Sequence, residues 1–302
     1  MCEFIAAEKT ERCKRQDFRS GASLFHEPIL APDSNPCYDI PAMGQYSIYL
    51  DAAKEVAREA GEILRRDYFK AGEIFFKGEV NLVTATDTES QAFIFDRLSK
   101  SFPGHDFLAE EGLKELSGAE FRWVFDPLDG TTNFAHRFPV FCVSIGLERG
   151  KELVCGVVYN PMSEEMFWAE RDDGAFFKGR PIRVSKIDDL NKALVATGFA
   201  YDIRENRTNM RHHDDFLLRT QAVRRCGSAA LDLCYVACGR FDGFWEMKLS
   251  PWDTAAGAVI VAEAGGRVTD FNGGPVDIYH PEVVASNGLI HQAMLDVLDG
   301  RR

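Results

Sequence analysis

The sequence predicts a layered α/β fold, and two observations support this prediction. In the second half of the chain, apolar segments typical of buried strands alternate with segments of helical periodicity, as expected when helices pack on sheets. In the middle of the chain, three apolar runs are separated by short polar turns, which predicts an antiparallel meander. With 302 residues, 45% of them apolar, the chain can build a large buried core.

The first 44 residues differ from the rest. They mix charges with four prolines and show no sustained period. We therefore expect 1–44 to be a poorly ordered N-terminal tail and 45–302 to form the folded domain. Met43 directly precedes the first periodic segment and is a candidate start of the protein.

Two helices are expected at the start of the folded domain. The first begins at Tyr46 and carries apolar residues on one face. These residues are Ile48, Ala52, Val56, Ala60, Ile63 and Leu64. After a turn at Lys77-Gly78, Asp87-Thr88-Glu89 opens the second helix. Its apolar contacts are assigned to Phe93, Ile94 and Leu98.

The remaining elements follow in order. Strands are expected at 105–111, 122–130, 140–150, 152–161 and 164–171, and the last three of these form the meander. The second half of the chain then supplies strands and helices in alternation. Its strands are expected at 193–199, 222–227, 241–247, 266–271 and 282–288, and its helices at 205–219, 228–239, 253–266 and 288–298.

Composition excludes several classes of function. Lys and Arg number 35 against 47 Asp and Glu, and this formal net charge of −12 argues against general nucleic-acid binding, which needs a basic surface. We find neither an apolar run of about 18 residues nor a secretory signal, so a cytoplasmic protein without a membrane span is expected.

The cysteines support an intracellular location. The chain has eight of them and no C-x-x-C pair, which favours buried, reduced thiols, with Cys142 and Cys155 in apolar strands. Cys234 and Cys238 lie four residues apart on a helix and could supply half of a metal site, although no further His or Cys ligands are spaced nearby.

Acidic residues fall at the ends of predicted strands in four places. These are Asp87, Glu110-Glu111, the pair Asp126 and Asp129, and Asp253. Taken singly, Asp129 and Asp253 also suit the capping of helices. Taken together, however, carboxylates that follow buried strands require a positive partner.

The segment DPLDGTTNF, at 126–134, indicates which metal and which type of reaction the site suits. Pro127 favours an extended backbone at Asp126, so Asp126, Asp129 and the Leu128 carbonyl can all face one space. Their oxygens are hard ligands of the kind that suits Mg²⁺. The free N–H groups of the following turn form an anion site. Carboxylates beside a phosphate site require metal ions between them, which indicates metal-assisted hydrolysis of phosphate esters.

These motifs resemble the inositol monophosphatase family. DPLDGTTNFAHRFPVFCVSIG, at 126–146, resembles its first signature, and SPWDTAAGAVIVAEAGG, at 250–266, resembles its second. NLVTATD at 81–87, AEEG at 109–112 and GSAALDLCYVACGRFDGFWE at 227–246 match in the same order. The resemblance covers residues 46–298 and implies the alternating α-β-α-β-α sandwich shared with fructose 1,6-bisphosphatases.

The resemblance also assigns roles to residues. It implies two or three Mg²⁺ ions bound by Glu110, Asp126, Asp129, Asp253 and the Leu128 carbonyl, with Glu111 outside this ligand set. Asp87 and Thr131 would orient the attacking water, and Lys77 resembles an upstream lysine of the family. Substrate contacts are implied for Glu110, Leu128, Asp129, Gly130, Thr131, Gly227, Ser228, Ala229, Glu246 and Asp253. No covalent enzyme intermediate is needed, and His136 is interpreted as structural.

The resemblance favours inositol 1-phosphate as the substrate, with inhibition by Li⁺ and a homodimer whose interface could lie at 138–170. Nucleotide and histidinol phosphatases tend toward DGTKEF and DGTRSF, whereas this chain has DGTTNFAHRFP. Another sugar, nucleotide or histidinol phosphate remains an alternative substrate. A non-enzymatic accessory role in RNA-related assemblies is a second alternative, although the charge argues against direct RNA binding. The segment GAVIVAEAGG lacks the order of a dinucleotide loop.

Overall fold

A computed structural model describes residues 44–70, 75–76, 82–83 and 85–301. By its internal contacts the chain divides into the units Met1–Ala42 and Met43–Arg302, and all described residues lie in the second. Residues 1–43 of the predicted tail and the turn at Lys77-Gly78 lie outside the described residues, so both stay predictions.

The larger sheet has eight strands in the order β10-β9-β8-β7-β6-β5-β3-β4. Their bounds are β3 Asp106–Ala109, β4 Lys114–Glu115, β5 Phe121–Asp129, β6 Cys142–Arg149, β7 Glu152–Asn160, β8 Glu165–Glu170, β9 Gly174–Phe177 and β10 Arg180–Pro181. The expected meander is confirmed, because β6, β7 and β8 pair antiparallel in chain order. It continues into β9 and β10, which the sequence pattern did not indicate. Only β3 and β5 pair in parallel within this sheet.

The smaller sheet has five strands in the order β12-β11-β13-β15-β14. Their bounds are β11 Leu194–Thr197, β12 Ala222–Arg224, β13 Gly243–Met247, β14 Arg267–Thr269 and β15 Glu282–Ser286. β11 runs parallel to both of its neighbours, whereas β15 runs antiparallel to both of its own. A separate antiparallel pair joins β1 Phe75–Phe76 to β2 Leu82–Val83.

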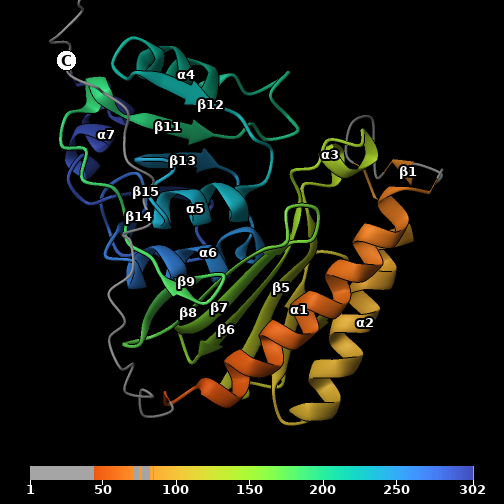
Figure 1. Cartoon of the computed structure of the whole chain (residues 1–302). Coiled ribbons are helices and arrows are strands. Elements are labelled where there is room, and N and C mark those ends of the chain that lie inside the picture. The colour runs from red at the N-terminus through yellow and green to blue at the C-terminus, as the bar shows by residue number, and fades with distance from the viewer. Residues whose placement is uncertain (1–43, 71–74, 77–81, 84, 302) are drawn as a thin grey trace, which may run out of the picture. The chain divides into compact units, whose positions relative to one another are not determined.

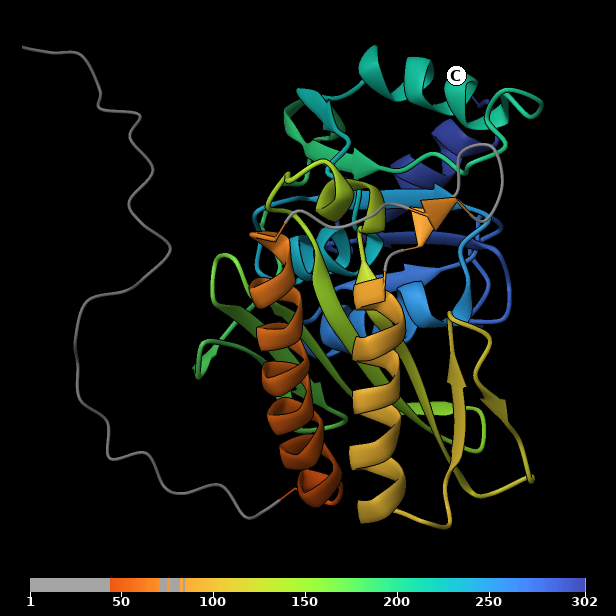
Figure 2. The same cartoon turned by 90° about the vertical axis from the view of Figure 1, so that its right-hand side faces the viewer.

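The helices complete five layers. Their bounds are α1 Ser47–Tyr68, α2 Ala85–Ser101, α3 Thr131–Ala135, α4 Thr208–Leu217, α5 Ala229–Ala237, α6 Pro251–Glu263 and α7 His291–Leu298, with a short 3₁₀ turn at Leu190–Lys192. α1 and α2 lie side by side against the larger sheet (Figures 1 and 2), and α5 and α6 pack between the two sheets. α4 and α7 cover the outer side of the smaller sheet (Figure 1). The predicted layered α/β fold is therefore confirmed.

The buried face of α1 differs from the expected one. The helix buries Leu50, Ala53, Val56, Ala57, Ala60, Gly61 and Leu64. Ile48 is instead 63% exposed. Most of the residues expected on this face are four positions apart, and each such step corresponds to a turn of about 400° around the helix axis. Over four steps the face drifts by about 160°, so only the middle and the end of the series stay on the buried side. In α2 the predicted apolar contacts are confirmed, since Ile94 and Leu98 are buried and Phe93 packs against the same core. The helix itself begins at Ala85, two residues before the expected start at Asp87.

The apolar core lies on both faces of the larger sheet. One cluster fills the layer between α1, α2 and this sheet, and another surrounds α5 and α6. Cys142, Cys155, Cys234 and Cys238 are buried free thiols, and Cys234 and Cys238 pack within the second cluster. Across the described ranges, no helix combines the length and apolar character that crossing a bilayer requires.

Candidate active site

A cleft with a volume of about 470 Å³ gathers most of the predicted site residues. The predicted residues that line it are Glu110, Asp126, Leu128, Asp129, Gly130, Thr131, Gly227, Ser228, Ala229, Glu246 and Asp253. Segments separated by more than 100 residues in sequence therefore meet at one place. Lys77 lies outside the described residues, so its predicted role stays a prediction.

A bulge in β5 turns Asp126 and Asp129 to the same side. Residues three apart on a regular strand point to opposite faces. Here Asp126 pairs with Ser144 but Asp129 pairs with Cys142, so β5 has one more residue than β6 over this stretch. The extra residue reverses the alternation, and both carboxylates face the cleft. The Leu128 N–H donates to Asp126 Oδ1 at 2.9 Å and holds the bulge.

Asp129 connects β5 to the N-terminus of α5. Its Oδ2 accepts a hydrogen bond from Ser228 Oγ at 2.6 Å and another from the Ala230 N–H at 2.9 Å. The capping alternative predicted that Asp129 caps the helix that follows it. In the structure the N-cap residue of α3 is Gly130, and no side chain caps this helix. Gly130 is required there, because its φ is +98° and a Cβ would lie 2.9 Å from the Val140 carbonyl.

Asp253 lies in the first turn of α6, not before it. The helix begins at Pro251, so the expected start at 253 was two residues late. Ser250 and Asp253 form a capping box, and the Ser250 N–H donates to Asp253 Oδ2 at 2.7 Å. Proline suits the first helical position because its missing N–H would have no partner there. The capping alternative is therefore correct for Asp253, yet its carboxylate also faces the cleft.

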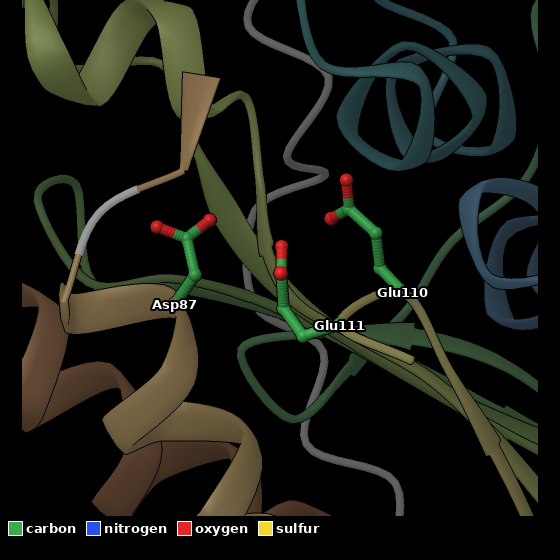
Figure 3. A group of neighbouring side chains, drawn as sticks. All are labelled: Asp87, Glu110 and Glu111. Carbon is green, nitrogen blue, oxygen red and sulfur yellow. The ribbon is translucent and has the colours of Figure 1, made fainter. Parts of the chain in front are cut away.

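Two groups of carboxylates result. In the first, one oxygen from each of Asp126, Asp129 and Asp253 lies within 4.8 Å of the others. In the second, Asp87, Glu110 and Glu111 meet the same criterion. Figure 3 shows the second group, with Glu111 projecting between Asp87 of α2 and Glu110 from the turn after β3.

Side chains of α2 hold the turn that carries Glu110 and Glu111. The Gln91 amide donates to the Glu111 carbonyl at 3.1 Å and accepts from the Glu111 N–H at 2.9 Å. Ser90 Oγ also donates to the Pro127 carbonyl at 2.9 Å. One helix therefore aligns the 110–111 turn with the bulge of β5.

Thr131 connects the two carboxylate groups. Its hydroxyl lies 3.2 Å from Asp87 Oδ1 and 3.1 Å from the Leu128 carbonyl oxygen, and it can donate its single proton to either. Asp87 and Thr131 are both buried, so this contact is shielded from bulk water. The sequence prediction paired these two residues, and the structure places them in direct contact.

The electrostatics of the cleft favour a cation. Burial raises the pKa of Asp126 well above its ordinary value, and the charges of Glu110, Asp129 and Asp253 raise it further. Burial likewise raises the pKa of Asp253 and of Asp129, and the Asp129 charge adds to the rise at Asp253. Carboxylates this close together and shielded from water repel one another, so their charged forms are stabilised when a cation lies between them.

The ligand set fits a hard divalent cation. All the candidate ligand atoms are oxygens, as Mg²⁺ prefers, and the set lacks the nitrogen and sulfur atoms typical of zinc sites. Hydrogen bonds hold one oxygen of Asp126, one of Asp129 and one of Asp253, which fixes each carboxylate in place. Such preorganisation is what oriented metal ligands require.

The cleft is also lined by Glu246 and by residues that the sequence analysis did not assign. Burial, with repulsion from Asp232 and then Asp129, raises the pKa of Glu246 to about 8. Asp232 is 1% exposed and lines the cleft from α5. An acidic residue on an otherwise apolar helix was the available sequence signal for it. Tyr201 and Arg225 also line the cleft.

Comparisons with known proteins place this geometry in a family. Residues 46–299 match the model of the inositol monophosphatase family. Inositol monophosphatase 3 of Solanum lycopersicum is 43% identical over 268 residues, covering 85% of this chain and 98% of the relative. Inositol-1-monophosphatase of Synechocystis sp. is 45% identical over 253 residues, covering 83% of this chain and 88% of the relative.

A solved structure agrees with these relatives. The inositol monophosphatase from Anabaena (Nostoc) sp. PCC 7120 is 41% identical and superposes with a TM-score of 0.79, covering 86% of this chain and 98% of its own. Fold, sequence and the convergence of the acidic motifs thus agree. The chain belongs to the inositol monophosphatase family of phosphoric monoester hydrolases.

Proposed function

We propose that this protein is a Mg²⁺-dependent phosphatase that hydrolyses inositol 1-phosphate to inositol and phosphate. The observation that carries the proposal is the convergence of two carboxylate groups on one cleft, joined by the Thr131–Asp87 contact. Similar proteins are named inositol monophosphatases or inositol-1-monophosphatases, which supports this choice of substrate.

Two or three Mg²⁺ ions would be held by Glu110, Asp126, Asp129, Asp253 and the Leu128 carbonyl. When bound, such ions neutralise phosphate oxygens and make water more acidic. Glu111 lies in the same carboxylate group as Glu110, so its place outside the ligand set stays a prediction.

Thr131 and Asp87 would guide the attacking water. A water that donates to Thr131 Oγ leaves the threonine proton free to move along its 3.2 Å contact to Asp87 Oδ1. The first-turn N–H groups of α3, which have no side-chain cap, would bind the phosphate. Attack by water requires no covalent intermediate, so the reaction needs no cysteine nucleophile.

The alcohol part of the ester would lie toward Glu246 and the turn formed by Gly227, Ser228 and Ala229. These residues line the same cleft, and Asn133 of α3 donates to the Gly227 carbonyl at 3.3 Å. The Glu246 carboxyl and nearby backbone groups can exchange hydrogen bonds with ring hydroxyls. A polyol phosphate therefore suits the chemistry of this wall better than an apolar ester does.

A substrate panel tests the proposal. The purified protein is given Mg²⁺ with inositol 1-phosphate, fructose 1,6-bisphosphate, adenosine 3′,5′-bisphosphate or histidinol phosphate, and released phosphate is measured. We expect inositol 1-phosphate to give the highest kcat/KM, chelation to abolish the activity, and Li⁺ to inhibit uncompetitively. Preference for another ester would reject the substrate assignment. If none of these esters were hydrolysed by the folded protein, the accessory role would gain support.

A further inference from the structure

The Glu246 carboxylate occupies space that only a glycine at position 198 leaves open. Gly198 directly follows β11, and β11 pairs in parallel with β13, with Thr197 opposite Trp245. Continuing this register places Gly198 beside Glu246. A Cβ atom at Gly198 would lie under 3.0 Å from both carboxylate oxygens of Glu246. Any other residue at 198 would therefore displace the carboxylate.

A buried asparagine holds Gly198 and the strand that carries Glu246 in this arrangement. Asn209 of α4 is 6% exposed, and its Nδ2 donates to the Gly198 carbonyl at 2.5 Å and to Thr197 Oγ1 at 3.1 Å. Its Oδ1 accepts from Trp245 Nε1 at 2.8 Å. Trp245 is fully buried and stacks on Phe216, with ring centroids 3.9 Å apart. Asn209 thus ties the end of β11 to the strand that carries Glu246.

We infer that Gly198 and Asn209 are positioning residues that set the location of the Glu246 carboxylate, and with it the selectivity for the alcohol part of the substrate. The inference rests on the proposed function, in which Glu246 contacts substrate hydroxyls. Gly198 and Asn209 act through Glu246. Neither residue belongs to the carboxylate groups or to the Thr131–Asp87 contact.

The substitution Gly198→Ala tests the inference. The backbone of Gly198 is not in the left-handed region, and the atoms it would meet are the far end of a flexible side chain. The variant should therefore fold, with Glu246 moving aside. Substrate hydroxyls left without the Glu246 partner in this cleft lose enough binding that the KM for inositol 1-phosphate should rise by about 10- to 100-fold. The Ki for inorganic phosphate, which has no alcohol part, should change by less than about twofold.

Two controls separate this role from a structural one. In a Glu246→Ala background the carboxylate is absent, so adding Gly198→Ala should leave the KM within about twofold. Gly104 has open space around its Cα, so Gly104→Ala should match the parent protein throughout.

Asn209→Asp tests the second positioning residue. It keeps the acceptor for Trp245 but removes both donors, and it should reproduce the rise in KM more weakly.

The outcomes distinguish the two proposals. Equal changes in the KM for inositol 1-phosphate and the Ki for phosphate would overturn the positioning role, as would additive effects of Gly198→Ala and Glu246→Ala. If the parent protein hydrolyses a different ester of the panel, the substrate assignment fails on its own. The same comparison, made with that ester, then still decides the role of Gly198.

Discussion

Replacing Asp129 by Asn separates a metal ligand from a structural hydrogen-bond acceptor. Asparagine keeps a carbonyl oxygen that can accept from Ser228 and from the Ala230 N–H, but it removes one negative charge. The ligand oxygens of Asp126, Asp129 and Asp253 lie within 4.8 Å of one another. Two unit charges at that separation repel by about 3.5 kcal/mol at an effective dielectric constant of about 20.

Because of this repulsion, the substitution should affect the free energy of unfolding differently with and without metal. In metal-free buffer, Asp129→Asn should be at least as stable as the parent protein, because relief of repulsion offsets the weaker hydrogen bonds. The raised pKa values of these carboxyl groups lower the relief below the full 3.5 kcal/mol, because protonation already removes part of the charge. With Mg²⁺ the parent should gain about 3 kcal/mol at a concentration 100-fold above Kd, and the variant should gain much less.

Thermal unfolding with Mg²⁺ or with a chelator measures the difference. For a domain of this size, about 3 kcal/mol corresponds to a Tm shift of roughly 6–12 °C. Asp106→Asn is the matched control, since Asp106 is 1% exposed and accepts from both the N–H and the hydroxyl of Ser117, but belongs to neither carboxylate group. It should lose stability equally in both buffers. The same pattern for Asp129→Asn, with unchanged turnover, would refute its role as a ligand.

Three further predictions test other parts of the account. Thr131→Val should lower kcat by about 10²- to 10⁴-fold while the KM changes little, as steady-state kinetics would show, because it removes the hydroxyl of the proposed proton relay. Deleting residues 1–43 should leave kcat/KM within about twofold, since every assigned site residue lies beyond them; a large loss of activity would contradict this. Burial lowers the pKa of His291 to about 4, so the folded state excludes a proton that the unfolded state binds below about 6.5. Chemical unfolding should therefore show about 3 kcal/mol of stability lost from pH 6.5 to pH 4, and a shallower loss in His291→Gln.

Motifs in the sequence predicted the site because each one places a carboxylate by local chemistry. The proline of DPLD and the turn that follows it are local features, and the structure brings both aspartates to one cleft. The sequence could not show how this happens. The bulge that realigns Asp129 depends on pairing with Cys142 and Ser144, which lie on another strand. The start of α6 was placed late because the capping box at Ser250 was not recognised.

Contacts between distant segments explain the rest of what was missed. Asp232 is buried on an apolar helix, yet only the packing of α5 between the sheets brings it to the cleft beside Glu246. Gly198 has no side chain to mark it, and its importance depends on a register between β11 and β13. Local sequence patterns therefore predict which charged residues belong to the site, whereas strand pairing decides which other residues surround them.

The most direct test of the central claim is to locate the metal ions. Crystals soaked in Mn²⁺, which shares the oxygen-ligand preference of Mg²⁺, would be measured for anomalous scattering. The account predicts anomalous peaks bounded by the carboxylates of Glu110, Asp126, Asp129 and Asp253, at positions that lose occupancy in Asp129→Asn. An empty cleft at saturating Mn²⁺, with peaks only elsewhere on the surface, would contradict it.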